Sequence, residues 1–98
     1  MSLLLEFHPA VREELDDEFR WYEKQSPGLD VDFLLEVEQV LAQIAANPTR
    51  HGYADGEVRM GLLNRFPFAV YYRVLSDRIR VLAIFHSSRD PYIWQSRN

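Results

Sequence analysis

Hydrophobic residues recur every three or four positions in the first half of the chain, which is the spacing of one face of an α-helix. Val11, Leu15, Phe19 and Tyr22 follow one another at steps of four, four and three. A second stripe with similar spacing consists of Phe33, Val37, Val40, Leu41 and Ile44. The pattern predicts two amphipathic helices, each with one face turned to a common core.

Residues with restricted backbones mark where these helices begin and end. Pro9 stands where the first helical turn would begin, a position that tolerates proline. The Pro-Gly pair in residues 25–28, QSPG, separates the two helices, and Asp30 or Asp32 is expected to cap the second. Asn47-Pro48 ends that helix. Because the connection is short, the helices are expected to pack as an antiparallel hairpin.

In the second half the hydrophobic period falls from about 3.6 to 2, which is the period of a β-strand. Three runs alternate in this way: residues 57–64, 68–74 and 78–86. Turns at 64–67 and 75–78 separate them, so they are expected to form consecutive antiparallel strands. With a first strand at 3–7 and a polar loop at 49–56, the order is β-α-α-β-β-β. This predicts an α+β fold in which an antiparallel sheet packs on a helical hairpin.

Strict alternation assigns the strand residues to two faces of the sheet, of which the helices can cover one. The covered face is expected to take one set: Val58, Met60, Leu62, Phe68, Val70, Tyr72, Ile79, Val81, Ala83 and Phe85. The opposite face then carries a second set: Arg59, Leu63, Ala69, Tyr71, Arg73, Arg80, Leu82, Ile84 and His86. We expect this opposite face to be open and to bind an acidic amphipathic helix, an extended peptide or RNA. Residues 92–98 are too few for a self-stable helix, so any final turn there depends on packing.

Length and composition fit a single small domain over residues 1–98. The chain has no cysteine, which excludes disulfides and thiolate chemistry and agrees with a reducing cytoplasm. No run approaches the roughly 20 apolar residues of a membrane span. The net charge of −4 combines −8 over residues 1–46 with +4 over residues 47–98. The acidic total argues against a protein held on nucleic acid by phosphate contacts, and the split favours one positive face that a partner recognises.

The segment IFHSSRDPYIW, residues 84–94, carries the candidate chemistry. As a histidine, whose side chain titrates near neutral pH, His86 can serve as an acid or a base, and Arg89 can hold a phosphate. The simpler interpretation is that His86 caps the end of a strand and Arg89 contacts a partner. The acidic run at 13–18 lacks a histidine at i+4 that would complete a metal site, so we expect no metal and no cofactor.

The element order, together with FHPAVREELDDEFRWYE, RFPFAVYYRV and FHSSRDPYIW, resembles the RelE/ParE superfamily of bacterial toxins. The similarity covers about residues 5–96 and looks closest to the ParE-like branch, often called plasmid stabilisation proteins. The resemblance implies the toxin of a type II toxin–antitoxin system, neutralised by a small antitoxin whose disordered tail folds onto it. Toxins of the RelE type cut messenger RNA at the ribosome, whereas those of the ParE type poison DNA gyrase without doing chemistry.

One departure from the RelE pattern favours the ParE-like alternative. RelE-like enzymes have an important arginine early in the strand that matches FAVYYRV, and Ala69 holds that place here. We therefore expect a cytoplasmic toxin that inhibits an essential target by binding it, DNA gyrase by resemblance, rather than an enzyme. The alternative is a ribosome-dependent endoribonuclease with His86 and Arg89 as catalytic residues. A third possibility is an antitoxin-binding remnant without toxicity.

Nine residues are expected to bind partners: Arg59, Arg65, Tyr71, Arg73, Arg80, Leu82, Ile84, His86 and Arg89. The expected partners are the cognate antitoxin and DNA gyrase, or the ribosome and messenger RNA under the alternative, with no membrane. The resemblance also allows a homodimer, or a heterotetramer with the antitoxin.

Overall fold

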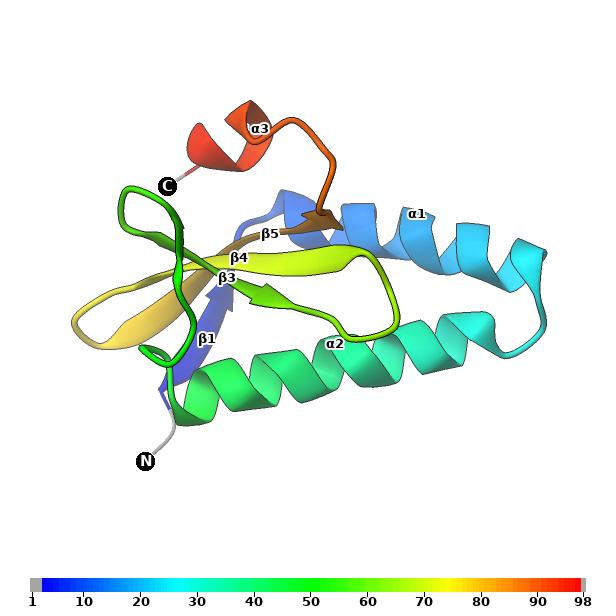
Figure 1. The fold of residues 1–98 in the computed structure, drawn as a ribbon, viewed down its shortest axis with the longest axis horizontal. Coiled ribbons are helices and arrows are strands. Elements are labelled where there is room, and N and C mark those ends of the chain that lie inside the picture. The colour runs from blue at the N-terminus through cyan, green and yellow to red at the C-terminus, as the bar shows by residue number, and fades with distance from the viewer. Residues whose placement is uncertain (1–2, 98) are drawn as a thin grey trace.

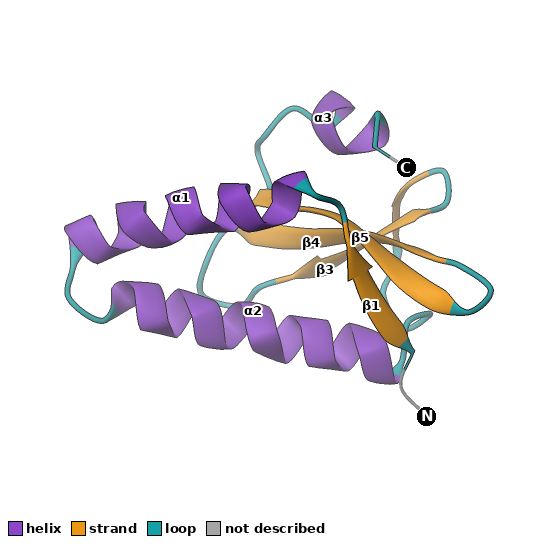
Figure 2. Cartoon of the chain, turned by 180° about the vertical axis from the view of Figure 1, so that it is seen from behind, coloured by secondary structure: helices purple, strands orange, loops and turns teal. Residues whose placement is uncertain are grey.

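The computed structural model describes residues 3–97, and its elements follow the predicted order. They are β1 (Leu4–Phe7), α1 (Ala10–Gln25), α2 (Leu29–Ala46), β2 (Tyr53–Asp55), β3 (Val58–Leu62), β4 (Phe68–Val74), β5 (Arg78–His86) and α3 (Tyr92–Gln95). The two long helices form an antiparallel hairpin against one face of a single sheet, and α3 lies on the opposite side (Figure 1, Figure 2). The α+β fold class predicted from the sequence is confirmed.

The five strands form one mixed sheet in the order β1-β5-β4-β3-β2. β3, β4 and β5 are consecutive antiparallel neighbours, as the alternation predicted. The turn between β4 and β5 is closed by a hydrogen bond that Leu75 N–H donates to the carbonyl of Arg78. β1 runs parallel to β5, so the sheet is not wholly antiparallel. The predicted loop at 49–56 contains the short edge strand β2, whose three exposed residues gave no alternation to detect.

The two long helices begin in different ways. Pro9 precedes α1 with a φ of −55°, the helical value that its ring imposes. For α2 the predicted cap is wrong, because Asp30 and Asp32 already lie inside its first turn. Its N-cap is Gly28, whose φ of 85° is a left-handed conformation that residues with side chains disfavour. The two aspartates instead place negative charge near the positive end of the helix dipole.

The helices and the sheet share a core centred on four aromatic rings. Tyr22 of α1 and Phe33 of α2 meet Phe66 and Phe68 at the start of β4, with neighbouring ring centroids 4.9 to 5.2 Å apart. Most of these pairs meet edge to face, the geometry that aromatic rings prefer. At the other end of α2, a Cβ added to Gly61 of β3 would lie only 3.1 Å from Val40, so helix and strand backbone pack closely there.

The face of the sheet opposite α1 and α2, which we call the far face, is covered in part by the C-terminal segment. Its buried cluster consists of Ala69, Tyr71, Leu82, Ala83, Phe85 and Trp94. Trp94 of α3 stacks on Tyr71 with ring centroids 4.5 Å apart and planes 13° apart. Arg97 then donates to both carboxylate oxygens of Glu14, at 2.9 and 2.6 Å, and to the Leu82 carbonyl at 2.9 Å. The expectation of an open far face is therefore wrong for its apolar half, where Tyr71 and Leu82 are buried.

β5 does not alternate strictly along its length. Its register against β4 shifts between Val81 and Ala83, so Leu82 is an extra residue, as in a β-bulge. Beyond this point Ala83 and Phe85 pack in the far-face cluster, whereas Ile84 packs in the helix-side core. The predicted faces of these last three residues are wrong, because the bulge reverses the alternation that follows it. The predicted far-face position of His86 is wrong for the same reason, since His86 lies opposite Phe68 of the helix-side core.

β3 is also turned relative to the prediction. Val58 and Met60, assigned to the helix side, pack against the far-face cluster. Arg59 lies opposite Tyr72 of β4 and so shares the helix-side face with it, and Leu63 packs in the helix-side core. The prediction that Arg59 and Leu63 lie on the far face is wrong. Leu62, also assigned to the helix side, lies opposite Ala69 of the far-face cluster, so that prediction is wrong as well. The alternation of β3 was read correctly, but the pairing with β4 turns its apolar face to the far side of the sheet.

Candidate partner-binding surfaces

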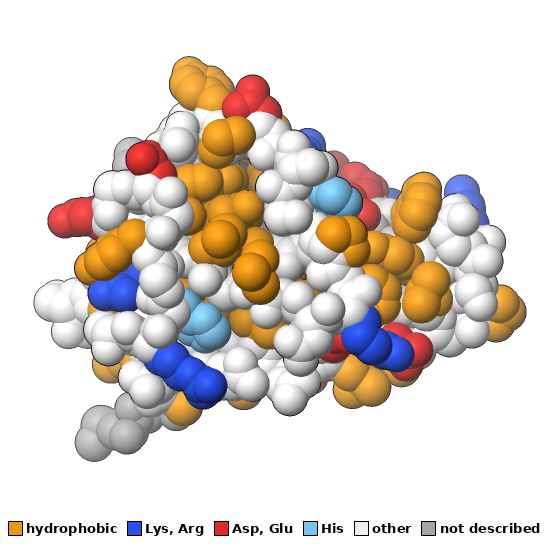
Figure 3. Space-filling view, in the orientation of Figure 1, with side chains coloured by type: hydrophobic (Ala, Val, Ile, Leu, Met, Phe, Trp, Pro, Cys, Tyr) orange, Lys and Arg blue, Asp and Glu red, His pale blue; other side chains and the backbone are white. Residues whose placement is uncertain are grey.

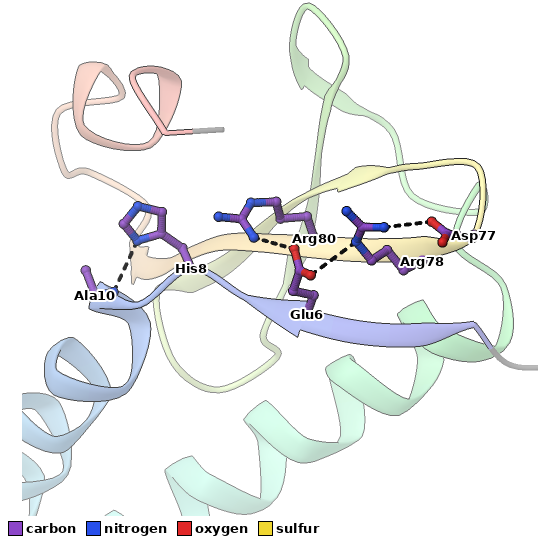
Figure 4. Close-up of polar contacts among 6 residues, drawn as sticks. All are labelled: Glu6, His8, Ala10, Asp77, Arg78 and Arg80. Atoms are coloured by element: carbon purple, nitrogen blue, oxygen red, sulfur yellow. Dashed lines mark hydrogen bonds and ion pairs between the residues drawn. The ribbon is translucent and has the colours of Figure 1, made fainter.

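Three arginines lie near the β4–β5 turn, and each is paired with a carboxylate of the same chain. Arg73 contacts Glu57 at 2.6 Å. Glu6 of β1 lies between two arginines of β5, pairing with Arg78 at 3.2 Å and with Arg80 (Figure 4). These pairs neutralise much of the positive charge that the sequence suggested for this face. A phosphate would have to compete with carboxylates already in place.

Arg59, which the sequence also assigned to the basic face, has a structural role at the edge of the sheet. Its guanidinium donates to the carbonyls of Thr49 and His51, at 3.3 and 2.6 Å, and to the Tyr53 hydroxyl at 2.8 Å. It also lies 4.0 Å above the ring of Tyr53. These contacts hold the segment that leads into β2, so the donors of Arg59 are largely used within the chain.

Arg65 is fixed to α2 through Glu36. The Glu36 carboxylate accepts hydrogen bonds from the Asn64 N–H (2.8 Å), the Arg65 N–H (3.0 Å) and the Arg65 Nε (2.9 Å). Burial alone would raise the pKa of Glu36, but these hydrogen bonds outweigh it and hold the pKa below the usual value. Arg65 also reaches Asp32 at 3.4 Å. The contacts pin the turn between β3 and β4 to the second helix.

His86 and Arg89 lie within one turn at the end of β5. The His86 Nδ1 is 3.1 Å from the Ser88 N–H nitrogen and 2.7 Å from the Ser88 hydroxyl, and the imidazole meets the ring of Phe68 at 5.5 Å. The Arg89 guanidinium lies 4.1 Å above the ring of Phe85. Both side chains therefore make the contacts of a strand end and its following turn.

The structure does not bring the expected site residues into one surface. Arg73 and Arg80 are cross-strand partners at one end of the sheet. His86 is paired with Phe68 at the other end, six residues from Arg80 and so about 20 Å away along the strand. The apolar members of the set are buried: Tyr71, Leu82 and Ile84. An endoribonuclease that combines His86 with the arginines of the sheet would need these groups to be adjacent.

A surface that the sequence did not predict lies on the outer side of α1 and α2, and we call it the helix-pair groove. It has a volume of about 480 Å³ and is lined by Phe7, Val11, Arg12, Leu15, Asp16, Phe19, Leu34, Val37, Glu38 and Leu41. Phe7 and Leu34 are 43% and 39% exposed, so the groove offers apolar surface to a partner. The sequence contained one indication that α2 exposes apolar surface. This helix has apolar residues outside its buried stripe, at Val31, Leu34 and Leu35.

The comparisons with known proteins agree with the fold. The family model described as the ParE toxin of the type II toxin–antitoxin system parDE matches residues 5–91. A solved structure described as the chromosomal ParDE toxin–antitoxin system of P. aeruginosa aligns with a TM-score of 0.75 at 18% identity, covering 87% of this chain and 96% of that one. No curated protein matches. None of the helices within residues 3–97 is long and apolar enough to cross a membrane.

The family match extends from β1 through β5 and includes both helices of the hairpin. It therefore takes in the helix-pair groove, the paired arginines and the His86–Arg89 turn. The chain belongs to the ParE toxin family of type II toxin–antitoxin systems.

Proposed function

We propose that the protein is a toxin that inhibits an essential target by binding it, DNA gyrase by family resemblance, and that a cognate antitoxin neutralises it. The helix-pair groove is the observation that carries this proposal. An apolar groove on a domain of 98 residues exposes side chains that a monomer would otherwise bury. An amphipathic antitoxin segment placed in it would cover Phe7 and Leu34, and Arg12 at the rim could pair with an acidic residue of that segment.

The charges of the sheet favour binding over RNA cleavage. Arg65, Arg73 and Arg78 each face a carboxylate of the chain at 3.2 Å or less. Cleavage by attack of a 2′-hydroxyl needs cations that are free to stabilise the phosphate as its charge rises in the transition state. Ala69 also stands where RelE-like enzymes carry an arginine. These features support a toxin that does no chemistry of its own.

The second candidate function is a RelE-type endoribonuclease, and one observation favours it. His86 and Arg89 lie within a single turn, so an imidazole and a guanidinium are available near one another at the end of β5. Such a pair could serve as the proton-transfer group and the phosphate-binding group of a nuclease.

Two assays separate these functions. The purified protein is mixed with DNA gyrase and supercoiled DNA, and separately with translating ribosomes. Trapped double-strand breaks in the first assay support the gyrase proposal. New messenger 5′ ends within codons in the second would refute it in favour of the nuclease. If both assays are negative while the antitoxin encoded beside the toxin binds tightly, the protein is the non-toxic remnant.

The proposal also places the protein in the cytoplasm, where gyrase and an antitoxin would meet it. A pair of toxin and antitoxin could assemble further into a heterotetramer, or the free toxin could form a homodimer. Mass measurement of the free toxin and of the co-purified complex determines which of these assemblies forms.

A further inference from the structure

A pocket of about 560 Å³ lies between α1 and the end of the sheet where β4 begins and β5 ends. It is lined by Asp17, Glu18, Trp21, Tyr22, Pro67, Phe68 and His86. In Figure 3 a histidine, acidic side chains and hydrophobic side chains adjoin one another over the end of β5. The residues of α1 in this pocket differ from those in the helix-pair groove, so the two sites lie on different sides of the same helix.

Glu18 is the carboxylate of this pocket that has no close partner. Asp17 is held by Arg20 at 2.7 Å, whereas no side chain or N–H within residues 3–97 donates a hydrogen bond to Glu18. Burial raises the pKa of Glu18, and the positive charges of Arg89 and His86 only partly oppose that rise. A half-buried carboxylate without a donor is stabilised by any ligand that brings one.

The walls beside Glu18 are aromatic. Trp21 is 53% exposed and meets the ring of Tyr22 edge to face, with centroids 5.0 Å apart. Phe68 and the imidazole of His86 form the opposite wall. Aromatic faces attract cations, and a guanidinium also stacks on them through its planar group. An aromatic pocket with an unpaired carboxylate is therefore suited to an organic cation.

We propose that this pocket binds an arginine or lysine side chain of a partner protein. The cationic head would donate to the Glu18 carboxylate while its aliphatic stem lies along Trp21 and Phe68. A protein partner is favoured because residues 1–46 carry a charge of −8, which attracts a basic surface rather than a single free amine. The exposed indole of Trp21 at the rim offers the further apolar contact that such a surface can use. This inference does not depend on gyrase or on an antitoxin.

The test uses the intact protein and the blocked tripeptide acetyl-Gly-Arg-Gly-amide, with the matching citrulline peptide as a neutral isostere. Chemical shifts are followed by NMR at about 0.15 M salt, where long-range attraction is screened. We expect saturable shifts at the Trp21 indole and the His86 ring with the arginine peptide, and none with citrulline. The buried indole of Trp94 serves as an internal reference, and its shift should not change.

Two variants locate the site. Glu18→Gln keeps the size and polarity of the side chain and should weaken binding of the arginine peptide at least fivefold. Glu13→Gln removes the same charge from an exposed position of α1 outside the pocket and should leave binding unchanged. Equal weakening by both variants would mean that only general electrostatic attraction acts, and the proposal would be wrong. It would also be wrong if the citrulline peptide bound as well, or if no shift at the pocket saturated.

Discussion

At the scale of single residues, Glu36 joins two parts of the chain that are far apart in sequence. Its carboxylate accepts three hydrogen bonds from Asn64 and Arg65, and its own side chain is only 12% exposed. We predict that Glu36→Gln destabilises the fold by about 1–3 kcal/mol, because two backbone N–H groups lose a charged acceptor. Urea unfolding at pH 7 measures this change. The same substitution at the exposed Glu23 should alter the free energy of unfolding by less than about 0.5 kcal/mol.

The direction of the Glu36 pKa also fixes where this stabilisation is lost. The folded-state pKa lies below the ordinary value of 4.5, so the unfolded chain takes up its proton first as the pH falls. The contribution of Glu36 is therefore complete above about pH 4.5 and decreases below it. If Glu36→Gln and the wild type still differed by the same free energy near pH 3, this account of the carboxylate would be wrong.

Two histidines, His51 and His8, make the free energy of unfolding depend on pH in a higher range than Glu36 does. Burial and the nearby Arg50 lower the pKa of His51, whose Nε2 is buried without a hydrogen-bond partner in the described part of the chain. Burial, Arg97 and Arg80 lower the pKa of His8. Both groups are protonated more readily in the unfolded chain, so stability should be complete above about pH 6.5 and should fall as the pH drops below it.

The measurement is the free energy of unfolding in urea between pH 7.5 and 5.5. His51→Gln should reduce the slope in this range, because one of the two groups that link unfolding to proton uptake is removed. His8 remains and should preserve part of the slope. An unchanged slope in His51→Gln would show that His51 does not resist protonation in the folded state.

At the scale of secondary-structure elements, α3 is held by packing rather than by its own helical hydrogen bonds. It has four residues, and Trp94 supplies its main contact with the sheet. We predict that Trp94→Ala releases α3 from Tyr71 and costs about 3–5 kcal/mol of stability. Denaturant unfolding measures the cost, and near-ultraviolet circular dichroism should show loss of the ordered Tyr71–Trp94 pair.

Tyr92 in the same helix provides the control for this prediction. It is 70% exposed, so Tyr92→Ala removes an aromatic ring of similar size without opening a cavity. Its effect should stay within about 0.5 kcal/mol. Equal destabilisation by both variants would mean that helix formation in α3, and not the contact of Trp94, limits stability.

Periodicity predicted the helices well and the faces of β3 and the second half of β5 badly, for a physical reason. In α1 the apolar stripe is bordered by charged residues, so only one rotation of the helix buries it. In β5, Leu82, Ala83, Ile84 and Phe85 are all apolar, and both faces of the strand are buried. Alternation then carries no information, and the sequence cannot reveal a bulge at Leu82.

The candidate site was harder to predict because it depends on contacts between distant segments. Arg80 and Glu6 lie 74 positions apart, and Arg65 and Glu36 lie 29 apart, so no local pattern showed that these charges are paired. The turn that holds His86 and Arg89 could be predicted from the sequence, because its residues are contiguous in the chain. The helix-pair groove depends on how two helices and β1 lie relative to one another, which no local pattern gives, although α2 carries apolar residues outside its buried stripe.

At the scale of the whole molecule, the structure offers separate surfaces of different chemistry. The helix-pair groove is apolar, the arginines near the β4–β5 turn are neutralised by carboxylates, and the apolar half of the far face is covered by α3. The sequence alone placed partner binding on the far face. Because α3 covers the apolar half of that face, we expect the main contact with an antitoxin at the helix-pair groove instead, where apolar side chains are still exposed.

This arrangement leads to a prediction about the antitoxin complex. Leu34→Glu places a charge among the apolar side chains of the groove, and we expect it to weaken antitoxin binding at least tenfold, about 1.4 kcal/mol. Leu34 is 39% exposed, so the domain should still fold. Arg73→Glu, on the face that the sequence favoured, should have a smaller effect, because Arg73 is already paired with Glu57 and lies on the other side of the sheet. Titration calorimetry with the antitoxin measures both variants. A larger loss for Arg73→Glu than for Leu34→Glu would restore the far face as the docking surface, and would require α3 to move aside when the antitoxin binds.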